Sequence, residues 1–149
     1  MEISKKYFED FELGGKLAPT RARTVTEADI VNFASLTGDW YPLHTDVEFA
    51  KKSMFGERIA HGMLVLSIAS GLNPPYDWAF IAFYGIENVR FTAPVKIGDT
   101  IHVEAEVIDK KDRGDNGVIT LRELVKNQRG EDVTAWTVRA LLAKRGKEA

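Results

Sequence analysis

The sequence predicts an α+β protein in which one curled antiparallel sheet wraps around a long central helix. Residues 62–72 form an almost wholly apolar run, which is typical of a helix buried on most sides. Four segments with alternating apolar and polar residues follow it, separated by short turns that contain glycine. Because strands and helices do not alternate along the chain, we expect the strands to pair antiparallel.

The chain before residue 38 is expected to supply one strand and one helix. Residues 17–25 read as a short strand, with Pro19 tolerable only near its start or on an edge. Thr26 and Asp29 form a variant of the capping box, so a helix should begin there and stop at Gly38. The face that this helix turns toward the core is expected to carry Ile30, Phe33, Ala34 and Leu36.

Residues 39–45 contain Pro42 and show no helical or alternating period, so we expect a loop. Asp46 is placed to cap a short helix that ends at Lys51 and Lys52, where positive charge suits the C-terminal end of the helix dipole.

The second half of the chain is expected to form the central helix and the sheet. The helix should end near Gly71 or Asn73, because two prolines follow. The predicted strands cover residues 79–91, 100–111, 118–127 and 133–144. One sheet can enclose a helix that is apolar all round only by curling around it. That geometry is the hot-dog fold, and we expect residues 1–149 to form a single domain of this kind.

Composition excludes several classes of function. The formal net charge of −2 gives no electrostatic reason to expect nucleic acid or an anionic membrane as a partner. The chain has no cysteine, so disulfides, thiolate metal sites and a cysteine nucleophile are excluded. The N-terminal ten residues lack the apolar core of a signal peptide, and no apolar run approaches the ~20 residues that span a bilayer. We therefore expect a cytoplasmic protein.

Asp39 and His44 are the first candidates for chemistry. They lie five residues apart in the proline-containing loop, where a tight turn could bring both side chains to one water. A carboxylate beside an imidazole favours and orients its charged form, which suits acid–base catalysis near neutral pH. An isolated pair of this kind is more often a turn cap and a packing residue.

Three motifs carry a resemblance to a known family. Residues 38–46 read GDWYPLHTD, residues 55–63 read FGERIAHGM, and residues 91–99 read FTAPVKIGD. In this order they resemble the MaoC-like dehydratases, which include the (R)-specific enoyl-CoA hydratases, over nearly the whole chain. The resemblance reverses the odds on Asp39 and His44 in favour of catalysis.

The resemblance implies that Asp39 and His44 hold one water and act as the acid–base pair. It also implies that the N–H of Gly62, at the first turn of the central helix, binds the thioester oxygen, a contact worth ~3 kcal/mol in comparable oxyanion holes. The family pattern has Asn where this chain has Tyr41. A phenol can still donate and accept a hydrogen bond, so Tyr41 remains a substrate-binding candidate with an altered role.

Two further residues are substrate-binding candidates. His61 could touch substrate beside Gly62, although fixing the loop by hydrogen bonds is the simpler role. Ser70 lies near the position of a serine that lines the acyl pocket in relatives. The set of His44, Asp46 and His61 also invites a zinc interpretation, but its spacing matches no usual ligand pattern, so we expect no metal.

Aromatic and basic residues give weaker signals. Residues that could line an acyl tunnel, or simply pack in the core, are Trp40, Trp78, Phe80, Phe83 and Tyr84. Residues that could meet the phosphates of coenzyme A, or simply carry surface charge, are Arg58, Arg90 and Lys96.

The function that follows from the resemblance is reversible hydration of a trans-2-enoyl-CoA to a (3R)-3-hydroxyacyl-CoA. It needs no cofactor other than the coenzyme A of the substrate, and acyl carrier protein is the less favoured carrier. Family members usually dimerise through the sheet, so we expect a homodimer or a larger assembly of dimers. The alternatives are a hot-dog acyl-CoA thioesterase and a non-catalytic acyl-CoA-binding regulatory module.

Overall fold

The computed structural model describes residues 5–147. Its helices are the 3-10 turn η1 (Phe8–Asp10), α1 (Glu27–Thr37), α2 (Pro42–Thr45), α3 (Val47–Lys51) and α4 (Gly62–Leu72). Its strands are β1 (Arg23–Thr24), β2 (Phe80–Phe91), β3 (Thr100–Asp112), β4 (Asn116–Lys126) and β5 (Asp132–Ala143). Residues 1–4 of the N-terminal stretch considered above lie outside the described part.

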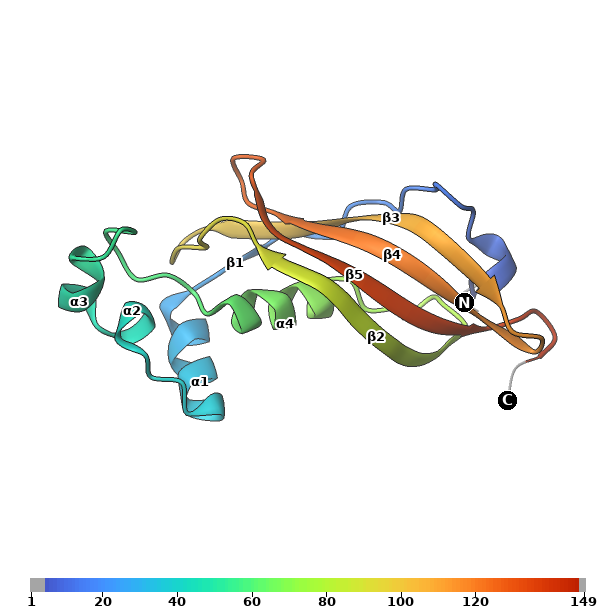
Figure 1. Ribbon diagram of the computed structural model, residues 1–149, viewed down its shortest axis with the longest axis horizontal. Helices are drawn as coiled ribbons and strands as arrows, with labels where there is room; N and C mark the ends of the chain where they lie inside the picture. Colours follow the sequence, from blue (N-terminus) through green and yellow to red (C-terminus); the bar gives the residue numbers. More distant parts are fainter. Residues whose placement is uncertain (1–4, 148–149) are drawn as a thin grey trace.

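The strands form one antiparallel sheet in the order β1-β3-β4-β5-β2. It curls along its length, and α4 lies against its concave face (Figure 1). This arrangement and the four long strands confirm the prediction from the alternating pattern. Along β3, the side chains that face α4 are buried, namely Ile101, Val103, Ala105 and Val107.

The core forms where α4 meets the sheet. Most of the helix is buried, as predicted from its composition, and the buried side chains are Leu64, Val65, Leu66, Ile68, Ala69 and Leu72. Met63 departs from this pattern and is 57% exposed. None of the described helices has both the length and the apolar character needed to cross a membrane.

Helices α1, α2 and α3 lie beyond one end of the sheet (Figure 1). The capping box of α1 is confirmed, because the side chains and backbone N–H groups of Thr26 and Asp29 bond reciprocally. The helix ends at Gly38, which adopts a left-handed conformation with φ of 78°. The expected burial is wrong for Leu36, which is 82% exposed.

Two predicted segments differ from the structure. Within residues 17–25, β1 covers two residues, and the chain before it bonds to β3 through the N–H groups of Gly14, Leu17 and Thr20. This spacing of three residues cannot make a strand ladder, in which bonding groups recur every second residue. The predicted loop after Asp39 contains the one-turn helix α2, which begins with Pro42 in its first turn.

A short backbone pairing joins the segment just before α4 to the segment between β2 and β3. The Ala60 N–H donates to the Val95 carbonyl at 2.7 Å, and Ile59 and Lys96 form an antiparallel bridge. Lys96 also forms an ion pair with Glu57, with 2.7 Å between Nζ and Oε1. The segment before α4 is thereby fixed to the segment that leads into β3.

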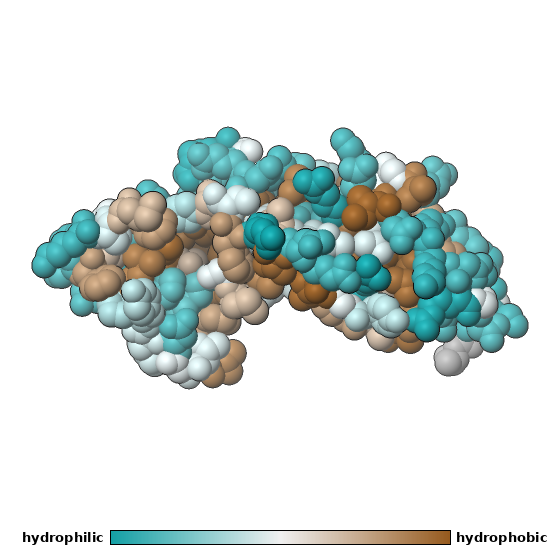
Figure 2. Space-filling view, in the orientation of Figure 1, coloured by the Kyte–Doolittle hydropathy of each residue, from teal (hydrophilic) through white to brown (hydrophobic). Residues whose placement is uncertain are grey.

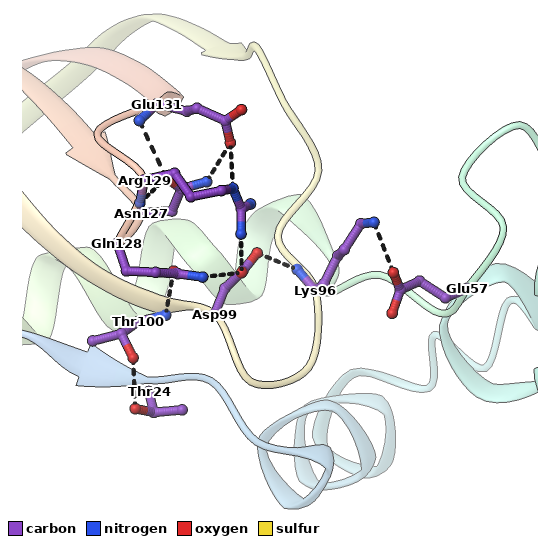
Figure 3. A network of polar contacts seen from close by, with 9 residues as sticks. All are labelled: Thr24, Glu57, Lys96, Asp99, Thr100, Asn127, Gln128, Arg129 and Glu131. Atoms are coloured by element: carbon purple, nitrogen blue, oxygen red, sulfur yellow. Dashed lines mark hydrogen bonds and ion pairs between the residues drawn. The ribbon is translucent and has the colours of Figure 1, made fainter.

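Asp99 anchors the turn that follows this pairing (Figure 3). The carboxylate is almost fully buried and accepts hydrogen bonds from the Lys96 N–H at 2.9 Å, from Gln128 at 2.8 Å and from Arg129 at 3.1 Å. Burial acts to raise the pKa of Asp99, but these bonds outweigh it and hold the pKa below its ordinary value. The charged form therefore stabilises the folded chain.

We expect Asp99→Asn to lower the free energy of unfolding at pH 7 by about 2 kcal/mol, since an amide NH2 cannot accept from the Lys96 N–H. A depressed pKa contributes stability above the unfolded-state value and loses it as the pH falls, so the deficit should shrink below about pH 4. Urea denaturation at several pH values measures this. The matched control is Asp115→Asn, on an exposed ion pair with Lys147; equal effects of the two variants would contradict the role of Asp99.

Candidate functional site

Three short segments converge beside the N-terminal end of α4. Asp39 follows the left-handed Gly38, His44 lies in α2, and His61 is the residue that precedes α4. One side-chain donor atom from each of these three residues lies within 4.8 Å of the others. The site thus joins residues that are 22 positions apart in the sequence.

The proton position on His44 follows from its contact with the backbone. Its Nδ1 lies 2.7 Å from the carbonyl oxygen of Ile59. Because a carbonyl oxygen only accepts, Nδ1 must carry the hydrogen, and Nε2 of the neutral ring is left with a free lone pair. His44 is therefore oriented as a base whose available nitrogen is Nε2.

The ring of His61 packs against the ring of His44. It is almost fully buried, and its ring stacks on that of His44 with 3.9 Å between centroids and 28° between planes. Its Nε2 donates to the backbone carbonyl of Asp39 at 3.0 Å. Its Nδ1 is buried without a hydrogen-bond partner among the described residues. These contacts connect the Asp39 backbone, His61 and His44 in one stack.

The Asp39 carboxylate is the exposed member of the cluster. About half of its side chain is accessible, and Oδ1 accepts the N–H of Tyr41 at 3.2 Å. Oδ2 lies 4.0 Å from His61 Nε2, whose N–H group already donates a hydrogen bond to the backbone carbonyl of Asp39. The carboxylate can therefore still accept a hydrogen bond from a small molecule beside His44.

The pKa of His44 lies below its ordinary value of 6.5. Burial is the largest cause, because it disfavours the charged imidazolium, and His61 lowers the pKa further. The hydrogen bond to the Ile59 carbonyl and the charge of Asp39 oppose these effects without cancelling them. At neutral pH the His44 ring is thus uncharged and able to accept a proton.

The residues that could bind a metal ion differ from the set His44, Asp46 and His61 that the sequence suggested. Asp46 is engaged elsewhere, because its Oδ1 caps α3 by accepting from the N–H groups of Glu48 and Phe49. Asp39, His44 and His61 are the residues that could supply ligand atoms to a metal ion. Each imidazole already uses one nitrogen on a backbone carbonyl, which leaves His44 Nε2 and His61 Nδ1 as lone-pair donors.

A cavity of about 260 Å³ opens beside the cluster. Its lining includes His44 and Gly62 together with Phe91 and Thr134 from the ends of β2 and β5. The N–H of Gly62 starts α4 and donates no hydrogen bond within residues 5–147. Gly62 and His44 therefore border the same cavity.

Phe91 packs against position 62 so closely that only glycine fits there without a shift of the ring. A Cβ placed at this position would lie 2.8 Å from Cζ of the Phe91 ring, closer than side chains pack. The absence of a side chain at residue 62 lets the aromatic ring of β2 rest directly on the start of the helix.

The remaining candidates fall in different places. Tyr41 is 55% exposed and presents its ring to His44 with 6.2 Å between centroids, so it borders the cluster. Ser70 lies on α4, eight residues after Gly62, and lines a second cavity of about 60 Å³. Three of the aromatic residues that could line an acyl tunnel, Trp78, Phe80 and Phe83, also line this second cavity.

Two of the three basic candidates have acidic partners in the structure. Arg58 pairs with Glu27 and Lys96 with Glu57, so both charges are partly neutralised. The remaining one, Arg90, donates to the adjacent Val89 carbonyl.

Sequence reasoning missed the roles of Phe91 and Glu123. Phe91 begins the third motif, and nothing in the local sequence indicates that its ring contacts Gly62. Glu123 is buried and lines the second cavity. A signal for it existed, because it occupies the inward phase of β4 together with Ile119, Leu121 and Val125.

Comparison with known proteins places these features in one family. The family model described as "MaoC like domain" matches residues 10–128. Protein MaoC of Klebsiella aerogenes is 44% identical over 135 residues, which cover 89% of this chain and 36% of that protein. A 3-hydroxybutyryl-CoA dehydratase of Methylorubrum extorquens is 36% identical over 72% of this chain and 68% of its own.

An (R)-specific enoyl-CoA hydratase of Rhodospirillum rubrum is 39% identical over 64% of this chain and 65% of its own. The chain therefore spans between about a third and two thirds of the length of these relatives.

Solved structures agree. A protein of Archaeoglobus fulgidus described as a monoamine oxidase regulatory protein superposes with a TM-score of 0.86 at 50% identity, over 94% of this chain and 95% of its own. A Mycobacterium tuberculosis protein described as a double hot-dog fold superposes with a TM-score of 0.85 at 19% identity, over 97% of this chain and 46% of its own. The curled sheet around α4 is thus a hot-dog fold.

The lowered pKa of His44 gives a direct test. Because burial disfavours the imidazolium, we expect the His44 ring to become protonated with a midpoint below pH 6.5. The C–H resonances of the three histidines, followed by NMR as the pH is lowered, measure the midpoint, and His44→Gln assigns the signal. A midpoint above 6.5 would contradict the effect of burial.

The contact between Gly62 and Phe91 predicts opposite effects of one substitution at two glycines of α4. Gly62→Ala should lower the free energy of unfolding by about 1–3 kcal/mol, because the new methyl group overlaps the Phe91 ring. Gly71→Ala should raise it by up to about 1 kcal/mol, since position 71 has open space and alanine favours the helix. Urea denaturation measures both, and a stabilising Gly62→Ala would show that the ring does not occupy this space.

Proposed function

Because this chain belongs to the MaoC-like hydratase and dehydratase family, we propose that it adds water reversibly to a trans-2-enoyl-CoA, giving a (3R)-3-hydroxyacyl-CoA. In this proposal the enzyme is a hydro-lyase, and Asp39 and His44 activate one water. The observation that carries the proposal is the free Nε2 lone pair of His44, placed beside the Asp39 carboxylate and at the wall of the cavity.

The proposed reaction uses the two side chains in separate roles. His44 Nε2 takes a proton from the water as its oxygen bonds to the β-carbon. Asp39 orients this water by accepting a hydrogen bond from its second O–H group, and the proton taken up by His44 is then passed to the α-carbon. One O–H bond of water breaks while a C–O bond and a C–H bond form, and both side chains end in the protonation state in which they began.

The proposed role of Gly62 is to stabilise the thioester oxygen. As the α-carbon gains electron density, the carbonyl becomes enolate-like and needs a hydrogen-bond donor. The Gly62 N–H is unpaired within the described residues and lies at the positive end of the α4 dipole, and Gly62 is one of the residues that line the cavity. This support requires no metal or redox cofactor, and coenzyme A enters as part of the substrate.

We propose a homodimer formed along β2. This strand is an edge of the sheet, and its exposed apolar side chains include Ile81, Phe83, Tyr84 and Ile86. Figure 2 shows hydrophobic patches, separated by hydrophilic residues, over the part of the molecule where β2 runs. Pairing with β2 of a second copy would satisfy the free backbone groups of the edge and cover this surface.

The alternatives predict different products from the same ligand. A hot-dog thioesterase would release free coenzyme A thiol, and a regulatory acyl-CoA-binding module would leave the ligand unchanged. Tyr41, which stands where the family has Asn, is the feature that favours the binding module. The free base at His44 favours turnover instead.

We expect crotonyl-CoA to lose its enoyl-thioester absorbance on mixing with the protein, without release of free thiol. Asp39→Asn and His44→Gln should each lower kcat at least 100-fold, since acid–base groups contribute roughly 10²–10⁴-fold. The control is His102→Gln, on the sheet outside the cluster, which should retain the wild-type rate.

Release of thiol would replace the proposal with thioesterase activity. Binding of crotonyl-CoA without any change in absorbance would replace it with the binding module.

A further inference from the structure

The cavity beside the cluster has a buried hydroxyl group in its wall. The lining residues whose side chains can form hydrogen bonds are His44, Thr92 and Thr134. His44 Nδ1 contacts the Ile59 carbonyl, and the Thr92 hydroxyl donates to the Asp132 carbonyl at 2.6 Å. Thr134 is 1% exposed, and its hydroxyl takes part in none of the hydrogen bonds among residues 5–147.

Thr134 lies on the concave side of the sheet, near the start of α4. Trp136, two residues later on β5, lines the second cavity together with Ser70 of α4, and alternate residues of a strand share one face. Thr134 is also the cross-strand partner of Phe91, whose ring rests on Gly62. Paired residues of this kind have Cβ atoms about 4.5–5.5 Å apart. The hydroxyl therefore belongs to the same wall as the contact between Phe91 and Gly62.

Packing alone does not explain threonine at this position. Burial of a hydroxyl without a hydrogen-bond partner opposes folding, and valine would fill the same shape without that cost. A ligand that accepts a hydrogen bond inside the cavity would satisfy the hydroxyl. The rest of the wall is largely apolar, which is the usual composition of a ligand site with a few polar groups that fix orientation.

We propose that Thr134 is a further ligand-binding residue, whose hydroxyl donates a hydrogen bond to a carbonyl oxygen of the acyl-CoA. This inference rests on the proposed function, which supplies the class of ligand. Close to the reacting carbons an acyl-CoA carries two carbonyl groups, that of the thioester and that of the first amide of the pantetheine arm. Both present the same acceptor to a hydroxyl group.

The test measures the Kd of butyryl-CoA by calorimetry. This ligand keeps the thioester but lacks the double bond that hydration consumes, so it reports binding alone. Thr134→Val should raise Kd about 3- to 10-fold, the usual effect of losing one hydrogen bond between uncharged groups. Thr134→Ser, which keeps the hydroxyl, should return Kd to within about twofold of the wild type. An unchanged Kd in Thr134→Val would overturn the proposal.

Stability separates a ligand contact from a structural one. Because the hydroxyl has no partner in the described part of the chain, Thr134→Val without ligand should unfold at a urea concentration no lower than the wild type. A lower midpoint would show that the hydroxyl holds the fold and would count against the proposal. The matched control is Thr137→Val, three residues later on β5 and on the opposite face, which should keep the wild-type Kd.

Infrared spectra of butyryl-CoA labelled with 13C at the thioester carbonyl distinguish the two acceptors. If the thioester oxygen is the acceptor, the C=O stretch of the bound ligand should lie at higher wavenumber in Thr134→Val than in the wild type, because a hydrogen bond weakens the C=O bond. A raised Kd with an unchanged band would assign the contact to the amide.

The failure of this proposal and that of the proposed function are distinguishable. If crotonyl-CoA is not hydrated, the proposed function fails, whereas the comparison of Kd values for butyryl-CoA still decides the role of Thr134. If butyryl-CoA does not bind to the wild-type protein, the hydroxyl has no thioester to contact and this inference fails.

Discussion

The candidate site depends on the backbone pairing between Ile59–Ala60 and Val95–Lys96. This pairing fixes the chain just before α4. The Ile59 carbonyl in turn sets the proton on His44, and His61, two residues later, supports both the His44 ring and the Asp39 backbone. Without this backbone pairing, α2 would be a four-residue helix at one end of the molecule, and few contacts would orient His44.

Two buried carboxyl groups show how hydrogen bonding decides the charge of an acid. Asp99 accepts three hydrogen bonds, one of them from a guanidinium group, and its pKa is lowered despite burial. Glu123 accepts two bonds from neutral donors, and its pKa is raised. The first carboxylate is committed to holding a turn, whereas the second keeps unused acceptor positions beside a cavity.

The sequence was sufficient where a period extends over many residues. The apolar run of α4 and the alternation in β3 predicted both elements and the side that each buries. The period fails for α2, because four residues contain a single turn and its start is set by Pro42. It also fails before β1, where the chain touches β3 at every third residue. The proximity of His61 to Asp39 arises from tertiary pairing, so local patterns indicated the residues but not their stack.

The resting place of the Phe91 ring on Gly62 couples two positions that lie 29 residues apart. A larger residue at 62 overlaps the Phe91 ring unless that ring shifts or a smaller residue stands at 91. The energetic effects of changes at the two positions are therefore not additive. A larger residue at position 62 should therefore be better tolerated when position 91 carries a smaller one, so the two positions together set how closely β2 approaches the start of the helix.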